Sequence, residues 1–455
     1  MDTSRRRFLA ATGLVGLPAA GCLDDGAGVA PIDDEPSYDR AVTHDGEAWT
    51  RYDLDWEPPT APPDLDVTVE TVVEDLEIPW DLAFAPDGDL FVSERTGRIA
   101  RYSADDLETV ASADVLSRAD AVAPGEEGGW WDAGGEGGLL GIAVHPNYPD
   151  VPLVYAFYTR ETDDGVANRL SHFDVEAPDP TATETVLIDD IPADDAVHNG
   201  ARLAFGPASY LWVTTGDAGD RGLAADPDSL AGSVLRLEPD GSAPADNPAI
   251  EGGDPRVFTY GHRNPQGITF LPDATPVITE HGPGSRDEVN VLRPGADHGW
   301  GPEEGGSFAR DGDTYPETDY ARPVVNTGPS ETWAPPGCVF YTGDAVPSWR
   351  NRLVVGGLSS QRINLVTVYS AGAETPPTAT ADGGTEGVRY DADWMDGDYD
   401  AVAHRALADE LGRIRHVEQG PDGALYAITS NRDGRAHQDR FPRPGDDRLV
   451  RIGPD

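Results

Sequence analysis

The chain has 455 residues and a formal net charge of −49, with 82 acidic residues against 33 basic ones, all of them Arg. A field of one sign this large makes a protein repel itself in dilute salt. Because 1 M salt shortens the screening length to about 3 Å, we expect a halophilic protein, folded in concentrated salt. The 10 Trp, 15 Tyr and 11 Phe argue against a disordered chain. The strongly acidic composition excludes nucleic acid as a partner.

Residues 1–22 are predicted to be an export signal. Three arginines at positions 5–7 precede a short apolar stretch, and small residues continue up to Cys22. This order is typical of a twin-arginine signal, which exports folded proteins. The letters "AAGC" resemble a lipobox, in which Cys22 is lipidated after cleavage. We therefore expect a protein at the extracellular face of the cell membrane, held there only by a lipid. The alternative is a plain export signal cut near Gly21.

Residues 23–66 are rich in Asp, Glu, Pro and Gly and have no sustained period. This composition is typical of a solvated linker. We expect an acidic flexible tether here, followed by a catalytic domain at 67–455.

One pattern recurs six times from residue 67 onward: a short apolar strand, a turn with proline, and a second apolar strand, as in "WDLAFAPDGDLFVSE". The turn prolines are Pro86, Pro146, Pro207, Pro272, Pro347 and Pro421. Proline presets a turn, and the alternating Val, Phe, Leu and Tyr around it favour strands. Six such units predict an all-β fold, a six-bladed β-propeller of four-stranded antiparallel blades. Residues 446–452 are expected to complete a blade, and 398–412 are the one clear helix candidate.

His198 and Asp217 flank the third hairpin, so both can reach one rim of the propeller. Histidine is a candidate general base because its ordinary pKa lies near neutrality, and a base needs a partner that orients its other ring nitrogen. The alternative is that His198 is a loop residue and Asp217 begins a turn.

Two further clusters lie at the edges of the repeats. Arg413 and Arg415 are two apart on an expected strand, so they face the same way and suit a ligand with several carboxylates. Salt bridges to the acidic surface are the alternative. In "EHGPGSRDEVN" (280–290), backbone carbonyls of a glycine-rich turn can converge on a hard cation such as Ca²⁺, although a simple turn is the alternative.

Together with "GHRNPQG", "NGARLAFGP…TTGD" and "GDDRLVRI", these clusters resemble the soluble PQQ-dependent sugar dehydrogenases, the glucose/sorbosone or aldose dehydrogenase family, over roughly 67–452. The resemblance implies oxidation of aldose sugars at C1 to lactones, with PQQ and Ca²⁺ as cofactors. It also implies an external electron acceptor, either a membrane quinone or a small redox protein.

The resemblance further implies roles for single residues. His198 matches the base that takes the proton of the anomeric hydroxyl, and Asp217 matches the carboxylate that orients it. Arg263 and Asn264 match contacts to the quinone side of PQQ, with Arg263 counted among the catalytic residues. Arg413 and Arg415 match contacts to the PQQ carboxylates. The carbonyls of Gly282 and Pro283 match ligands of the calcium ion.

The sequence departs from the family pattern at three places. A Lys that commonly touches PQQ has no counterpart, and Ser359 or Arg362 are the candidates to replace it. Glu136 stands where glucose-active relatives have a glutamine, so it is expected to affect the choice of substrate. Trp333 is a candidate for stacking on the cofactor.

Two other function classes are alternatives. One is a propeller lactonase or other hydrolase that uses a channel metal, which usually needs carboxylate and amide ligands not evident here. The other is a non-catalytic propeller that binds a carbohydrate or another ligand.

Overall fold

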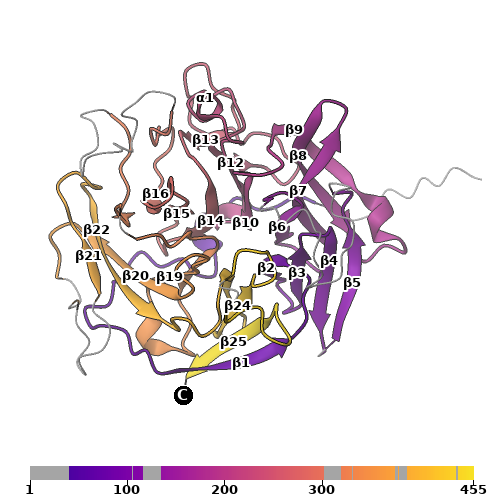
Figure 1. The fold of residues 1–455 in the computed structure, drawn as a ribbon. Coiled ribbons are helices and arrows are strands. Elements are labelled where there is room, and N and C mark those ends of the chain that lie inside the picture. Colours follow the sequence, from indigo (N-terminus) through magenta and orange to yellow (C-terminus); the bar gives the residue numbers. More distant parts are fainter. Residues whose placement is uncertain are drawn as a thin grey trace, which may run out of the picture. The chain divides into compact units, whose positions relative to one another are not determined.

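The computed structural model describes residues 40–104, 106–115, 135–301, 319–329, 331–374, 378, 387–436 and 439–454. In these residues the strands form six antiparallel sheets arranged around a common axis (Figure 1). The predicted all-β, six-bladed β-propeller is confirmed. Five of the six blades have four strands each, and the remaining one, blade 5, has an additional outer strand.

The first three blades follow each other along the chain. Blade 1 consists of β2 (Pro79–Phe84), β3 (Leu90–Glu94), β4 (Arg98–Ser103) and β5 (Asp106–Ser112). Blade 2 consists of β6 (Leu139–Val144), β7 (Leu153–Thr162), β8 (Gly165–Asp174) and β9 (Thr185–Pro192). Blade 3 consists of β10 (Gly200–Phe205), β11 (Leu211–Thr215), β12 (Ser233–Leu237) and β13 (Val257–Tyr260).

The last three blades close the ring. Blade 4 consists of β14 (Pro265–Phe270), β15 (Pro276–Glu280), β16 (Glu288–Val291) and β17 (Val325–Asn326). Blade 5 consists of β18 (Cys338–Tyr341), β19 (Arg352–Val355), β20 (Ile363–Ser370), β22 (Tyr399–Ala406) and β21 (Val388–Tyr390). Blade 6 joins β23 (Ile414–Gln419), β24 (Leu425–Thr429) and β25 (Leu449–Pro454) to the N-terminal β1 (Val67–Val73).

Both ends of the propeller meet in blade 6, because β1 pairs with β25 from Val67–Pro454 to Val73–Leu449. The expectation that residues 446–452 complete a blade is confirmed by β25. The expected helix at 398–412 is wrong, because residues 399–406 form β22 between β20 and β21. Pairing on both edges of this strand overrides the local helix preference of its alanines.

The six repeated prolines have one structural meaning. Each lies between the first and second strand of its blade, in the turns after β2, β6, β10, β14, β18 and β23. The loops that begin first strands and end second strands therefore gather at the opposite end of every blade. The candidate residues His198 and Asp217 lie in such loops.

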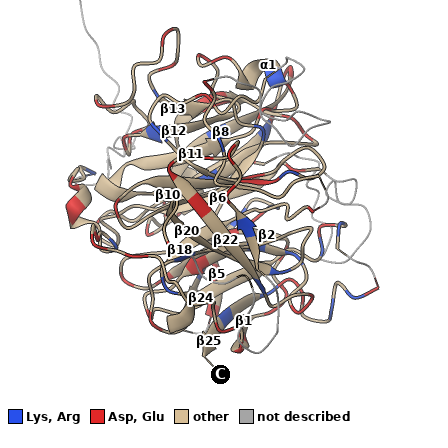
Figure 2. Cartoon of the chain, turned by 90° about the vertical axis from the view of Figure 1, so that its left-hand side faces the viewer, with Lys and Arg blue, Asp and Glu red and all other residues tan. Residues whose placement is uncertain are grey.

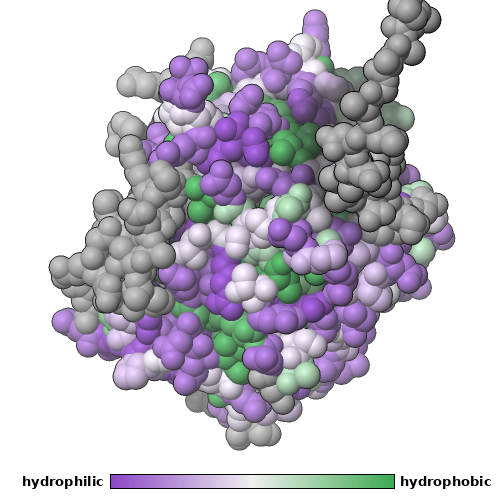
Figure 3. All heavy atoms as spheres, turned by 90° about the vertical axis from the view of Figure 1, so that its right-hand side faces the viewer, coloured by the Kyte–Doolittle hydropathy of each residue, from purple (hydrophilic) through white to green (hydrophobic). Residues whose placement is uncertain are grey.

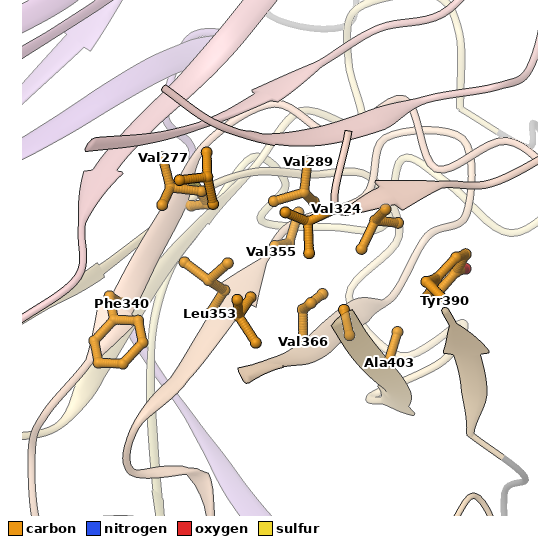
Figure 4. Close-up of a cluster of buried hydrophobic side chains, with 14 of the residues drawn as sticks. Val277, Val289, Val324, Phe340, Leu353, Val355, Val366, Tyr390 and Ala403 are labelled. Carbon is orange, nitrogen blue, oxygen red and sulfur yellow. The ribbon is translucent and has the colours of Figure 1, made fainter. Parts of the chain in front are cut away.

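Apolar side chains between neighbouring blades fix their alignment. Figure 4 shows one such cluster, in which Val277 and Val289 of blade 4 face Leu353, Val355 and Val366 of blade 5. All five side chains are fully buried, with 0% exposed. Burying one such side chain contributes about 1.5–3 kcal/mol, so the contact holds the two sheets in one relative position.

Residues 40–66 lie along the turn ends of blades 2 to 5, and we call them the N-terminal strap. Backbone and side-chain hydrogen bonds join it to these turns, from Asn147 Nδ2 to Ala41 O (3.0 Å), from Asp53 N to Pro272 O (2.9 Å) and from Asn351 Nδ2 to Glu57 O (2.8 Å). Trp49 packs on Phe270 and Trp56 on Phe340. This part of the expected tether thus differs from a solvated linker, because its tryptophans supply apolar contacts.

The surface is hydrophilic over much of the face drawn in Figure 3, and Figure 2 shows Asp and Glu mainly on loops and strand ends. Among the described residues, the exposed large hydrophobic side chains are Leu54, Val186 and Val388. No helix in this part of the chain is long and apolar enough to cross a membrane.

Candidate active site

His198 and Asp217 form a hydrogen-bonded pair at the end of blade 3. Gly200 pairs with Thr215 in the β10–β11 ladder, so the residues just outside the two strands lie side by side. His198 Nδ1 is 2.7 Å from Asp217 Oδ1. Because a carboxylate only accepts hydrogen bonds, Nδ1 carries a proton, and in the neutral imidazole Nε2 then has the lone pair. The pair therefore has the arrangement of a base and its orienting partner.

The Asp217 carboxylate is held on both oxygens. Oδ1 also accepts the Gly219 N–H at 2.8 Å, and Oδ2 accepts Trp300 Nε1 at 2.7 Å. Its backbone N–H donates to Arg263 O at 2.8 Å. Asp217 is 1% exposed, whereas the His198 side chain is 15% exposed. The pair thus places a buried charge behind an accessible imidazole.

A cavity of about 230 Å³ is lined by residues of blades 1, 2, 4, 5 and 6. Neither His198 nor Asp217 is among its lining residues, but Glu136, which lines it, accepts the His198 N–H at 2.9 Å. Its charged lining residues are four arginines and two acids: Arg95, Arg413, Arg415, Arg435, Glu136 and Asp433. In a chain of net charge −49, this local excess of guanidinium groups marks a site for an anion. Trp80 and Leu358 supply apolar lining.

Arg413 and Arg415 share one buried carboxylate. Asp433 Oδ2 is 2.7 Å from Arg413 NH2 and 3.6 Å from Arg415 NH2. Arg415 NH1 donates to Gln266 Oε1 at 3.1 Å, and its Nε is buried with no hydrogen-bond partner among the described atoms. Burial lowers the pKa of Arg415 to about 9. The N–H groups of the two arginines thus outnumber the acceptors around them, so they can bind the carboxylates of a ligand.

Arg263 and Asn264 lie in the loop between β13 and β14. Arg263 NH1 donates to His281 O at 3.0 Å, and burial lowers its pKa. Asn264 Oδ1 accepts the Gly200 N–H at 3.0 Å. The loop therefore joins blade 3 to blade 4 directly beside Asp217.

The turn at Gly282 and Pro283 is tied down by Asp287. Asp287 Oδ1 accepts the Gly282 N–H at 2.9 Å, while Oδ2 accepts the backbone N–H groups of residues 333 and 334. A Cβ on Gly282 would lie 2.2 Å from the carbonyls of Ser285 and Arg286, so only glycine fits. In the described residues no group of three or more His, Cys, Asp or Glu can hold a metal. A cation at this turn would therefore depend on backbone carbonyls.

Comparison with known proteins gives the family of the chain. Residues 76–438 match the family model described as Glucose / Sorbosone dehydrogenase. The chain belongs to this family. The resemblance found in the sequence is confirmed, and the protein is an oxidoreductase of the sugar dehydrogenase type.

Relatives in the glucose/sorbosone dehydrogenase family cover most of the chain. An aldose sugar dehydrogenase of Escherichia coli is 29% identical over 379 residues, which are 81% of this chain and 91% of the relative. A Thermus thermophilus structure described as an oxidoreductase (glucose dehydrogenase) is 35% identical, with a TM-score of 0.66, and the match covers 85% of this chain and 99% of that one. The PQQ-bound aldose sugar dehydrogenase of Streptomyces coelicolor is 28% identical, with a TM-score of 0.63 and coverage of 86% and 99%.

Not every residue expected from the family pattern lies at the cavity. Ser359 lines it, whereas Arg362 instead pairs with Glu331 and Asn364. Trp333 packs in the hydrophobic cluster between blades 4 and 5, is 2% exposed and does not line the cavity, whereas Trp80 does.

Arg95 and Arg435 line the cavity of this family member but were missed in the sequence. Arg95 follows β3 directly, and Arg435 lies in the loop after β24. Both follow the second strand of a blade, as Asp217 does in blade 3. Aligning the six repeats in the sequence at the end of their second strands would have pointed to Arg95 and Arg435.

Proposed function

We propose that the protein is a PQQ- and Ca²⁺-dependent aldose dehydrogenase that oxidises the sugar at C1 to a lactone and passes electrons to an external acceptor. The observation that carries the proposal is the His198–Asp217 pair, which a hydrogen bond to Glu136 joins to the lining of a cavity with four arginines. A membrane quinone or a small redox protein would serve as the acceptor.

The cavity suits a planar, carboxylated cofactor. Arg413 and Arg415 are proposed to bind its carboxylates, and Arg263 and Asn264 its quinone side. The unpartnered Arg415 Nε and the buried, unpartnered Nε2 of His281 support this fit, because buried polar atoms without partners are rare. When bound, PQQ supplies the acceptor for the sugar hydride, and Ca²⁺ on the carbonyls of Gly282 and Pro283 supplies a Lewis acid.

The chain's own residues handle the proton. His198 Nε2 is proposed to take the proton of the anomeric hydroxyl, because its Nδ1 already donates to Asp217. The Asp217 carboxylate then stabilises the imidazolium, as buried opposite charges do. Glu136 lines the cavity beside His198 and is proposed to face the sugar.

The location of the protein is proposed from the sequence alone. Residues 1–22 would direct export by the twin-arginine route, and a lipid on Cys22 would hold the protein at the extracellular face of the membrane. The charge of −49 supports a salt-rich environment.

Reconstitution tests the function. The full chain is purified in concentrated salt, PQQ and Ca²⁺ are added, and reduction of an artificial dye is followed with a panel of aldoses. Dye reduction that needs both additions is expected, and His198→Ala should abolish it without loss of PQQ binding. His44→Ala, on the strap, is the matched control. PQQ binding without turnover would favour a binding propeller, and no spectral change with PQQ would refute the cofactor.

A further inference from the structure

The backbone of His198 is strained for the residue proposed as the base. Its φ is +56°, in the left-handed region that favours glycine, so its surroundings must hold it there. The His198 N–H donates to Glu136 Oε2 at 2.9 Å, and the His198 carbonyl accepts the Ala218 N–H at 3.1 Å. A side-chain carboxylate thus takes the place of a backbone acceptor just before β10.

Two arginines from other blades fix Glu136. Arg95 NH2 donates to Gly135 O at 2.6 Å and to Gly137 O at 3.0 Å, the carbonyls on either side of Glu136. Arg435 NH1 is 3.2 Å from Glu136 Oε1. Burial alone would raise the pKa of Glu136, but Arg435 and the neighbouring groups lower it by more, so the pKa lies below its usual value. Glu136 is therefore a charged carboxylate at a fixed place.

A charged acceptor holds an N–H more firmly than a neutral one, because such hydrogen bonds are shorter and stronger. His198 is consequently held at two points, with its N–H on Glu136 and its ring Nδ1 on Asp217. These two contacts determine where Nε2 lies relative to the cavity. A displacement of about 1 Å at a reacting group costs roughly 10²-fold in rate.

We propose that Glu136 is a positioning residue that fixes the backbone of His198, and that Arg435 supports it through their ion pair. The inference rests on the proposed function of His198 as the base. It gives Glu136 a second role beside the sugar contact, and the two roles have different kinetic consequences. Lost positioning lowers kcat, whereas a lost sugar contact raises KM.

Kinetics of matched variants separate the two roles. Glu136→Ala removes the acceptor and is expected to lower kcat by about 10- to 100-fold. Glu136→Gln keeps one accepting oxygen but loses the charge and the ion pair with Arg435, so it should recover only part of kcat, and Arg435→Ala should lower kcat by several-fold. Glu108→Ala is the control, because Glu108 pairs with Arg101 at 2.6 Å on the outer strands of blade 1. Should Glu136→Ala fail to fold, Arg435→Ala carries the same comparison.

A second measurement needs no turnover. Histidine labelled with ¹³C in the ring is observed by NMR in the protein without cofactor, and His198→Ala assigns one of the ten histidine signals. Glu136→Ala should shift or broaden the His198 signal, Glu136→Gln should do so less, and Glu108→Ala should leave the signal unchanged. This result stands even if no sugar is oxidised, so it is separate from the proposed function. An unchanged His198 signal in Glu136→Ala, or a change confined to KM, would overturn the positioning role.

Discussion

Asp217→Asn is the sharpest test of the proposed base. An amide has one accepting end, so it cannot serve both His198 Nδ1 and Trp300 Nε1. Trp300 is 4% exposed, and leaving its buried N–H unpaired costs about 1–3 kcal/mol. Gly219 is exposed and can donate to water instead. The amide oxygen is therefore expected to turn toward Trp300 and the amide nitrogen toward His198.

In that orientation the amide donates to Nδ1, and the imidazole proton moves to Nε2. The nitrogen that faces the substrate then has no lone pair, so kcat should fall by about 10²- to 10⁴-fold. Dye reduction with saturating sugar measures kcat, and PQQ titration and the melting temperature check that the variant is folded and loaded. Asp220→Asn makes the same charge change at an exposed helix cap and should alter kcat less than about twofold. A folded, PQQ-bound Asp217→Asn enzyme with kcat within about threefold of normal would refute the assignment of the base.

Four other outcomes are expected. Arg415→Ala should weaken PQQ binding at least about tenfold in an absorbance titration, because hydrogen bonds between charged groups contribute about 1.5–3 kcal/mol; unchanged affinity would contradict the assignment. Chelation with EGTA should abolish dye reduction, and Ca²⁺ but not Mg²⁺ should restore it, since Mg²⁺ demands tighter octahedral ligands. Trp56→Ala should destabilise the fold by about 2 kcal/mol in calorimetry with kcat unchanged, because the strap lies at the turn ends of the blades. Lowering the salt to about 0.1 M should lower the melting temperature, because the acidic side chains then repel one another more strongly. A constant melting temperature would show that this repulsion does not limit stability.

The fold was predictable because its signal is local and repeated. Each proline turn with its flanking apolar strands can be recognised within some twenty residues, and all six prolines lie at the same place in their blades. The His198–Asp217 pair follows from the same logic, since a hairpin brings its two ends together. The sequence of residues 399–406 favours a helix locally, and the strand is set by pairing with β20 and β21, which lie outside this segment.

The rest of the site depends on contacts between blades, which no local pattern contains. Arg95, Glu136 and Arg435 come from blades 1, 2 and 6 and meet only when the ring is closed. The strap was hidden by its acidic composition, although Trp49 and Trp56 within it are the kind of residue that packs. The roles of the individual site residues stay predictions until the variants are measured.

Closure of the ring by β1 and β25 has a thermodynamic consequence for ligand binding. The cavity exists only while all blades that line it are in place, so an open or unfolded chain offers no site for the cofactor. A ligand that binds only the closed ring shifts the folding equilibrium by mass action, by about 2.7 kcal/mol at a concentration one hundred times its Kd. A bound cofactor would then stabilise the closed ring, and the loaded protein would stay folded at a salt concentration that opens the empty one.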